Sequence, residues 1–234
     1  MYGFFFDPTY ILVIIGLVLS MMASAYVNRT FQKYDEVRSR NNVTGTQAAQ
    51  YILENQKIHD VGVQQISGSL TDNYNSGSKM LSLSESTARS TSVAAIGVAA
   101  HECGHAVQDA KSYFPLRLRS AIVPVANFGS SIAIPLILIG ALIRGESGSF
   151  IINLGLLAFS LAFIFQLVTL PVEFNASKRA LAILGEGGLL TPEEVPMARK
   201  VLFAAALTYV AAMISTALQL LRLVLLFGNN NRRR

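Results

Sequence analysis

The sequence is poor in cysteine and in charged residues, and both shortages limit what the protein can be. One cysteine among 234 residues excludes an internal disulfide framework. Only 14% of the residues are charged, whereas 52% are hydrophobic. An ordinary soluble domain has about 25% charged residues, and a soluble chain of this size could not hide so much apolar surface. The composition excludes disorder and argues strongly against a soluble globular protein.

The positive charge does not point to nucleic acid. The formal net charge is +5, but the basic residues are scattered along the chain, without a basic helix or an aromatic RNA-binding motif. In a membrane protein, the distribution of lysine and arginine instead reflects the orientation of the chain in the bilayer. We therefore expect no nucleic-acid partner.

Four long apolar segments predict an integral membrane protein that is mainly α-helical. A hydrocarbon core about 30 Å thick is crossed by a helix of about 20 apolar residues. The four segments cover approximately residues 10–27, 121–143, 150–170 and 201–227, with Arg222 as their one charged residue. The first is expected to be a retained anchor rather than a signal peptide, because the residues before it contain Asp7 and no base.

The distribution of lysine and arginine predicts the orientation in a lipid bilayer. Fourteen of the 19 basic residues lie in residues 28–120 and 171–200. Basic loops remain in the cytoplasm, so both stretches are expected there, in a multi-pass protein of the cell membrane. The basic residues 232–234 would then lie outside, unless the fourth segment does not cross fully.

The segments divide the chain into five parts: residues 1–27, 28–120, 121–170, 171–200 and 201–234. The second part is polar enough to be a water-facing α+β domain. A helix is expected after Thr44 or Thr46, strands over residues 61–67 and 79–84 with turns between them, and a helix over residues 90–110. Residues 80–84 are either an ordinary strand or an edge strand to which an extended substrate could add.

The last helix of this domain contains the motif His101-Glu102-Cys103-Gly104-His105. Histidines four residues apart lie on one helical face, where both imidazoles can reach a tetrahedral Zn²⁺ ion. Glu102 is turned away by about 100° and can take a proton from a zinc-activated water. This is the His-Glu-x-x-His arrangement of zinc peptidases. Cys103 points to the far side and is expected to be a small buried hydrophobe.

A catalytic zinc site needs a third protein ligand. Glu173 is our candidate, because it follows the third apolar segment on the expected cytoplasmic side. Among the other acids after the motif, helix geometry sets aside Asp109, the membrane sets aside Glu146, and a flexible turn sets aside Glu186. Glu193 and Glu194 follow a helix-start signal and remain the next alternatives. Tyr74 and Tyr113 are both candidates for stabilising an oxyanion.

The stretches HECGHAVQ at residues 101–108 and VEFNASKRA at residues 172–180 resemble the YugP-type neutral zinc metallopeptidases of bacterial membranes. They are more distantly similar to the HtpX and CAAX-prenyl protease group. The resemblance covers most of the chain and implies peptide hydrolysis by a zincin-like insert. In that group the metal-binding glutamate is followed four residues later by aspartate. Here Ser177 stands at that position, so Asn175 or Ser177 would replace the carboxylate in part.

We therefore predict a membrane-embedded zinc endopeptidase that acts on polypeptides, including membrane-associated ones. The ligands are His101, His105 and Glu173, and the general base is Glu102. One alternative is a non-proteolytic membrane protein with a structural or sensory zinc site, which would need a fourth protein ligand. Another is a transporter, which usually has acidic or histidine residues inside its spans.

Overall fold

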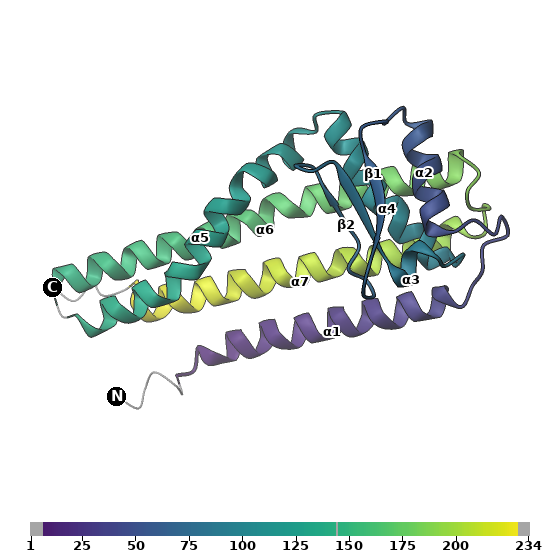
Figure 1. The fold of residues 1–234 in the computed structure, drawn as a ribbon. Coiled ribbons are helices and arrows are strands. Elements are labelled where there is room, and N and C mark those ends of the chain that lie inside the picture. The colour runs from purple at the N-terminus through teal and green to yellow at the C-terminus, as the bar shows by residue number, and fades with distance from the viewer. Residues whose placement is uncertain (1–6, 144, 229–234) are drawn as a thin grey trace. The chain divides into compact units, whose positions relative to one another are not determined.

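The structure, a computed structural model, describes residues 7–143 and 145–228. Over this range the chain is mainly helical, as predicted, with one small sheet (Figure 1). The helices are α1 (Tyr10–Asp35), α2 (Gly45–Asn55), α3 (Glu85–Ala88), α4 (Val93–Ala110), α5 (Phe114–Leu142), α6 (Glu146–Glu186) and α7 (Val195–Phe227). The strands are β1 (Gly62–Ile66), β2 (Asn73–Asn75) and β3 (Met80–Ser84).

Four of these helices, α1, α5, α6 and α7, are long and apolar enough to cross a membrane. They correspond to the four predicted segments, so this part of the prediction is confirmed. Each helix extends beyond its apolar segment, and α6 reaches 41 residues. Hydropathy marks only the lipid-compatible part of a helix, whereas the backbone hydrogen bonds continue into polar sequence.

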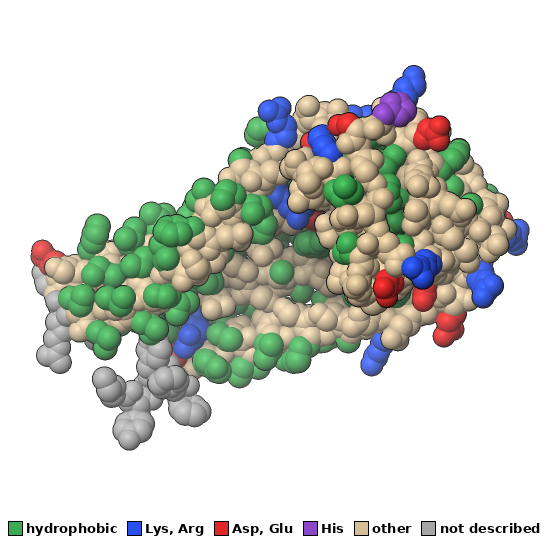
Figure 2. Space-filling view, in the orientation of Figure 1, with side chains coloured by type: hydrophobic (Ala, Val, Ile, Leu, Met, Phe, Trp, Pro, Cys, Tyr) green, Lys and Arg blue, Asp and Glu red, His purple; other side chains and the backbone are tan. Residues whose placement is uncertain are grey.

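The chain divides into two compact units. The membrane unit comprises the described residues up to Ala23, Leu118–Leu170 and those from Thr208 onward. The polar unit comprises Ser24–Arg117 and Pro171–Leu207. On the face drawn in Figure 2, hydrophobic side chains cover much of the membrane unit, while most charged side chains belong to the polar unit.

In the membrane unit, the single base of the predicted spans has an acidic partner. Arg222 Nη2 lies 3.1 Å from Asp7 Oδ2. The Arg222 guanidinium also lies over the ring of Tyr10, 5.2 Å from its centroid. A charge in a span is tolerated when it is paired, so this contact explains how Arg222 is accommodated within α7.

The sheet of the polar unit has the strand order β1-β3-β2. β3 pairs in parallel with β1, from Gly62↔Met80 to Ile66↔Ser84. It pairs antiparallel with β2, where Tyr74 lies opposite Leu81. β3 is therefore the central strand, and the interpretation of residues 80–84 as an edge strand is wrong. The turn-rich sequence between the two predicted strands contains β2, which covers the free side of β3.

The core of the polar unit surrounds α4. Ser92 caps this helix by accepting a hydrogen bond from the backbone N–H of Ala95. Thr44, rather than Thr46, caps α2, in a capping box with Gln47. The sheet and α2 both pack against α4, so most of its side chains are buried. Burial on several sides holds the motif helix rigidly.

Candidate metal centre

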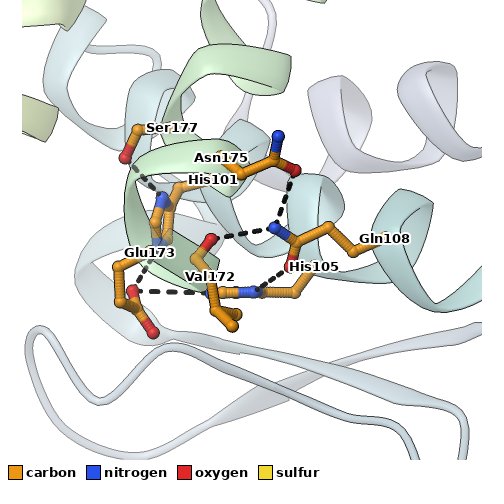
Figure 3. Close-up of polar contacts among 7 residues, drawn as sticks. All are labelled: His101, His105, Gln108, Val172, Glu173, Asn175 and Ser177. Carbon is orange, nitrogen blue, oxygen red and sulfur yellow. Dashed lines mark hydrogen bonds and ion pairs between the residues drawn. The ribbon is translucent and has the colours of Figure 1, made fainter. Parts of the chain in front are cut away.

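Three predicted site residues meet in the polar unit: His101 and His105 from α4 and Glu173 from α6. His101 Nε2 lies 3.2 Å from Glu173 Oε2, and His105 Nε2 lies 3.6 Å from the same oxygen. One ligand atom from each residue lies within 4.8 Å of the others. Figure 3 shows the three side chains pointing toward one another. The arrangement joins residues that are about 70 positions apart in the sequence.

The two nitrogen–oxygen separations match those of a tetrahedral zinc site. Bonds of about 2.0–2.1 Å at tetrahedral angles place neighbouring ligand atoms about 3.3 Å apart. The two nitrogen–oxygen distances, 3.2 and 3.6 Å, lie on either side of that value. The side chains of His101, His105 and Glu173 are only 14%, 9% and 2% exposed. Two imidazoles and one carboxylate are also the donor set of many catalytic zinc sites.

The close approach of α4 and α6 depends on Gly104, which lies between the two histidines. A Cβ atom at Gly104 would lie 2.5 Å from the carbonyl oxygen of Ala176, well inside normal contact. Ala176 follows Glu173 by three residues on α6. Glycine at this position therefore lets the backbone of α6 come near enough for Glu173 to meet the histidines.

Gln108 determines how His105 presents its ring. Gln108 Nε2 donates to the carbonyl oxygen of Val172 at 2.8 Å and to Asn175 Oδ1 at 3.0 Å. Because a carbonyl oxygen only accepts, the amide nitrogen must face Val172, and Oε1 then faces His105 Nδ1 at 3.0 Å. Nδ1 of His105 is therefore a donor, so in the neutral ring Nε2, which faces Glu173 in Figure 3, is the nitrogen that could bind a metal.

His101 has a comparable outer contact. Its Nδ1 lies 3.1 Å from Ser177 Oγ. Asn175, in turn, accepts a hydrogen bond from Arg179 Nε at 2.7 Å. Ser177 and Asn175 were the residues expected to replace a carboxylate in part, and the structure places each in a contact beside the cluster. Sequence reasoning missed Gln108, although its position three residues after His105 puts it on a neighbouring part of the same helical face.

Glu102 and Glu173 give the cluster a negative environment. Glu102 is 9% exposed. Burial lowers the pKa of His105, but the hydrogen bond to Glu173 and the charges of Glu102 and Glu173 outweigh it and raise that pKa above its ordinary value. The site therefore favours positive charge at the position where the three ligand atoms converge.

Other candidate residues have different partners. Asp109 accepts a hydrogen bond from the Tyr74 hydroxyl at 2.7 Å and lies 2.7 Å from Lys79 Nζ. Burial and the neighbouring Asp109 raise the pKa of Tyr74. The Tyr74 hydroxyl is therefore held as a hydrogen-bond donor to Asp109. Glu194 accepts hydrogen bonds from the backbone N–H groups of Arg40 and Thr191, each at 2.8 Å. Both carboxylate oxygens of Glu194 are therefore occupied by backbone donors just before α7.

Cys103 is fully buried, as predicted, and burial raises the pKa of its thiol. Its Sγ lies 3.7 Å from the carbonyl oxygen of Ala49 on α2. The thiol therefore packs on the side of α4 that faces the core. It is a structural side chain rather than a reactive one.

Comparison with known proteins gives two findings. The family described as "Putative neutral zinc metallopeptidase" matches residues 9–228. The chain is also 44% identical over 218 residues to "Putative membrane protease YugP" of Bacillus subtilis (strain 168), covering 93% of this chain and 96% of that protein. No solved structure matches the chain.

Proposed function

The chain belongs to the putative neutral zinc metallopeptidase family, and on that basis we propose that it is a zinc-dependent endopeptidase of the cell membrane. His101, His105 and Glu173 hold the metal. The observation that carries the proposal is the convergence of two imidazole nitrogens on one carboxylate oxygen, with both nitrogen–oxygen separations close to those around zinc.

The number of converging ligands supports a catalytic site over a structural one. A structural zinc site is closed by four protein ligands, whereas a catalytic site has three and leaves a position open. Within the described residues, the group that could hold a metal contains three. A non-proteolytic sensor or structural clip therefore has less support. When bound, zinc would polarise the scissile carbonyl and activate water for attack.

The protein's own side chains supply orientation and proton transfer. Gln108 holds His105 with Nε2 facing inward, and Ser177 contacts His101 on its Nδ1 side. Glu102 accepts a proton from the attacking water at its carboxylate and returns it to the departing amine. Its low exposure keeps the carboxylate away from bulk solvent.

The substrate is a polypeptide, and we place the active site on the cytoplasmic side. Both sequence stretches that build the site, residues 28–120 and 171–200, carry the excess of basic residues that marks cytoplasmic loops. Pairing of substrate along Met80–Ser84 is no longer part of the mechanism, because β3 has a neighbour on each side. A flexible chain near the bilayer is the expected substrate.

The test compares two carboxylates in the purified full-length protein. Glu173→Ala should lose bound zinc and peptide cleavage together, because two imidazoles alone would have to hold the ion. Glu193→Gln is the matched control, since Glu193 is an exposed acid two residues before α7, and this variant should keep both properties. Chelation should abolish cleavage by the wild type, and added zinc should restore it. Full zinc occupancy in Glu173→Ala would remove Glu173 from the ligand set.

A further inference from the structure

The polar unit contains a groove of about 510 Å³ between the ends of α6 and α7. Its walls are mostly apolar, with Phe174 and Leu181 from α6 and Leu202 and Phe203 from α7. Glu173 and the two motif histidines do not line it. Ser177, which does line it, is the residue that contacts His101 Nδ1. The groove is thus next to the candidate metal centre but separate from its ligand atoms.

The groove combines apolar surface with positive charge. Phe174 is 44% exposed and Phe203 is 53% exposed, which is unfavourable for large aromatic side chains in water. Lys178 and Arg199 also line the groove, and both are exposed. The lining includes no acidic residue. A matching ligand must therefore have an apolar body and an anionic group.

The position of these residues along the chain identifies the source of such a ligand. Phe174 follows the end of the third predicted span, Leu170, by four residues, and Lys178 follows it by eight. Phe203 lies within the fourth predicted span, and Arg199 precedes that span by two residues. Basic side chains just beyond the edge of a span reach the lipid headgroup level, next to the apolar residues of the span.

We propose that this groove binds an acidic phospholipid. An acyl chain lies against Phe174 and Phe203, and the headgroup phosphate lies between Lys178 and Arg199. Arginine and lysine are the usual protein partners of phosphate, and basic pockets between membrane helices bind anionic headgroups. The proposal goes beyond peptide hydrolysis, and its test does not require activity.

The test titrates phosphatidylglycerol into the purified full-length protein in a neutral detergent and counts bound lipids by native mass spectrometry. The double variant Lys178→Gln/Arg199→Gln should bind phosphatidylglycerol roughly 30-fold more weakly than the wild type, because each lost basic group weakens binding about fivefold. The matched control Lys111→Gln/Lys200→Gln removes the same charge outside the groove and should bind like the wild type. Equal binding by the wild type and the groove variant would overturn the proposal.

Further arms separate the lipid from other ligands. Phosphatidylcholine, which has no net charge, and inorganic phosphate, which has no acyl chain, should each bind far more weakly than phosphatidylglycerol. Inorganic phosphate that competes at equal concentration would assign the groove to a free anion and contradict the proposal. An acidic, apolar peptide that binds the groove more tightly than phosphatidylglycerol does would also contradict the proposal.

Two other variants keep the conclusion valid even if the double variant Lys178→Gln/Arg199→Gln folds poorly. Lys178→Arg/Arg199→Lys keeps both charges and should retain lipid binding. Phe203→Ala removes part of the apolar wall without changing the charge and should weaken binding of phosphatidylglycerol. If Phe203→Ala binds the lipid as tightly as the wild type, the acyl chain does not lie against this residue and the proposal is wrong.

Discussion

Replacing Gly104 with alanine would test whether contact between α4 and α6 sets the geometry of the metal centre. The added Cβ atom would lie 2.5 Å from the carbonyl oxygen of Ala176 and 3.1 Å from its Cα atom. A carbon–oxygen contact normally starts at about 3.3–3.6 Å. The two helices would therefore have to separate by roughly 0.9 Å.

A displacement of this size is large for a metal site. Metal–ligand distances are held to within about 0.2 Å, and Glu173 lies on α6 only three residues before Ala176. We expect Gly104→Ala to weaken zinc binding by roughly 10- to 100-fold, the range seen when the surroundings of metal ligands are disturbed. The steric cost of about 1–3 kcal/mol should also exceed the gain of about 0.5–1 kcal/mol that alanine brings to a helix.

The measurement is the zinc dissociation constant of the purified protein, obtained by competition with a chelator of known affinity. Gly97→Ala is the matched control, because Gly97 lies seven residues earlier on α4 and its added Cβ would meet Ala198 Cβ at an ordinary 3.4 Å. Both variants gain the same helix propensity, but only Gly104→Ala should lose zinc affinity. If Gly104→Ala binds zinc as tightly as Gly97→Ala, helix separation does not control the site.

Two other predictions concern the surroundings of the site and its orientation. Gln108→Leu should weaken zinc binding about 10- to 100-fold, because His105 Nδ1 loses its acceptor. The control Gln50→Leu lies on the exposed face of α2 and should leave the zinc dissociation constant unchanged. Equal constants for the two variants would contradict the role of Gln108. Orientation can be tested in a chain with Cys103 replaced by alanine. In intact cells, a cysteine at Ser76 should be shielded from an impermeant thiol reagent, and a cysteine at Ser147 should be labelled. The reverse pattern would place the active site outside the cell.

The four long helices could be predicted because the thickness of the bilayer imposes both their length and their composition. The two motif histidines could be placed on one face because helical spacing is a local property. The strand order could not be predicted in the same way. Asn73–Asn75 resembles a turn in composition, and its pairing with β3 depends on contacts that no local pattern records.

The surroundings of the candidate metal centre were also only partly predictable. Glu173 was chosen by eliminating other acids, and the structure brings it to the histidines across about 70 residues of sequence. The roles of Gly104 and Gln108 depend on where α6 passes α4. Both residues were visible in the sequence, but only the packing of the two helices shows what each one contacts.

The most direct test of the proposed mechanism is the substitution Glu102→Gln. Glutamine has nearly the shape of glutamate but cannot accept the proton, and Glu102 is not one of the three converging residues that could hold a metal. The account predicts a zinc content equal to that of the wild type and cleavage of a peptide substrate reduced by about 10²- to 10⁴-fold. Both quantities should be measured on the same purified sample. Wild-type cleavage by Glu102→Gln with zinc bound would contradict the account.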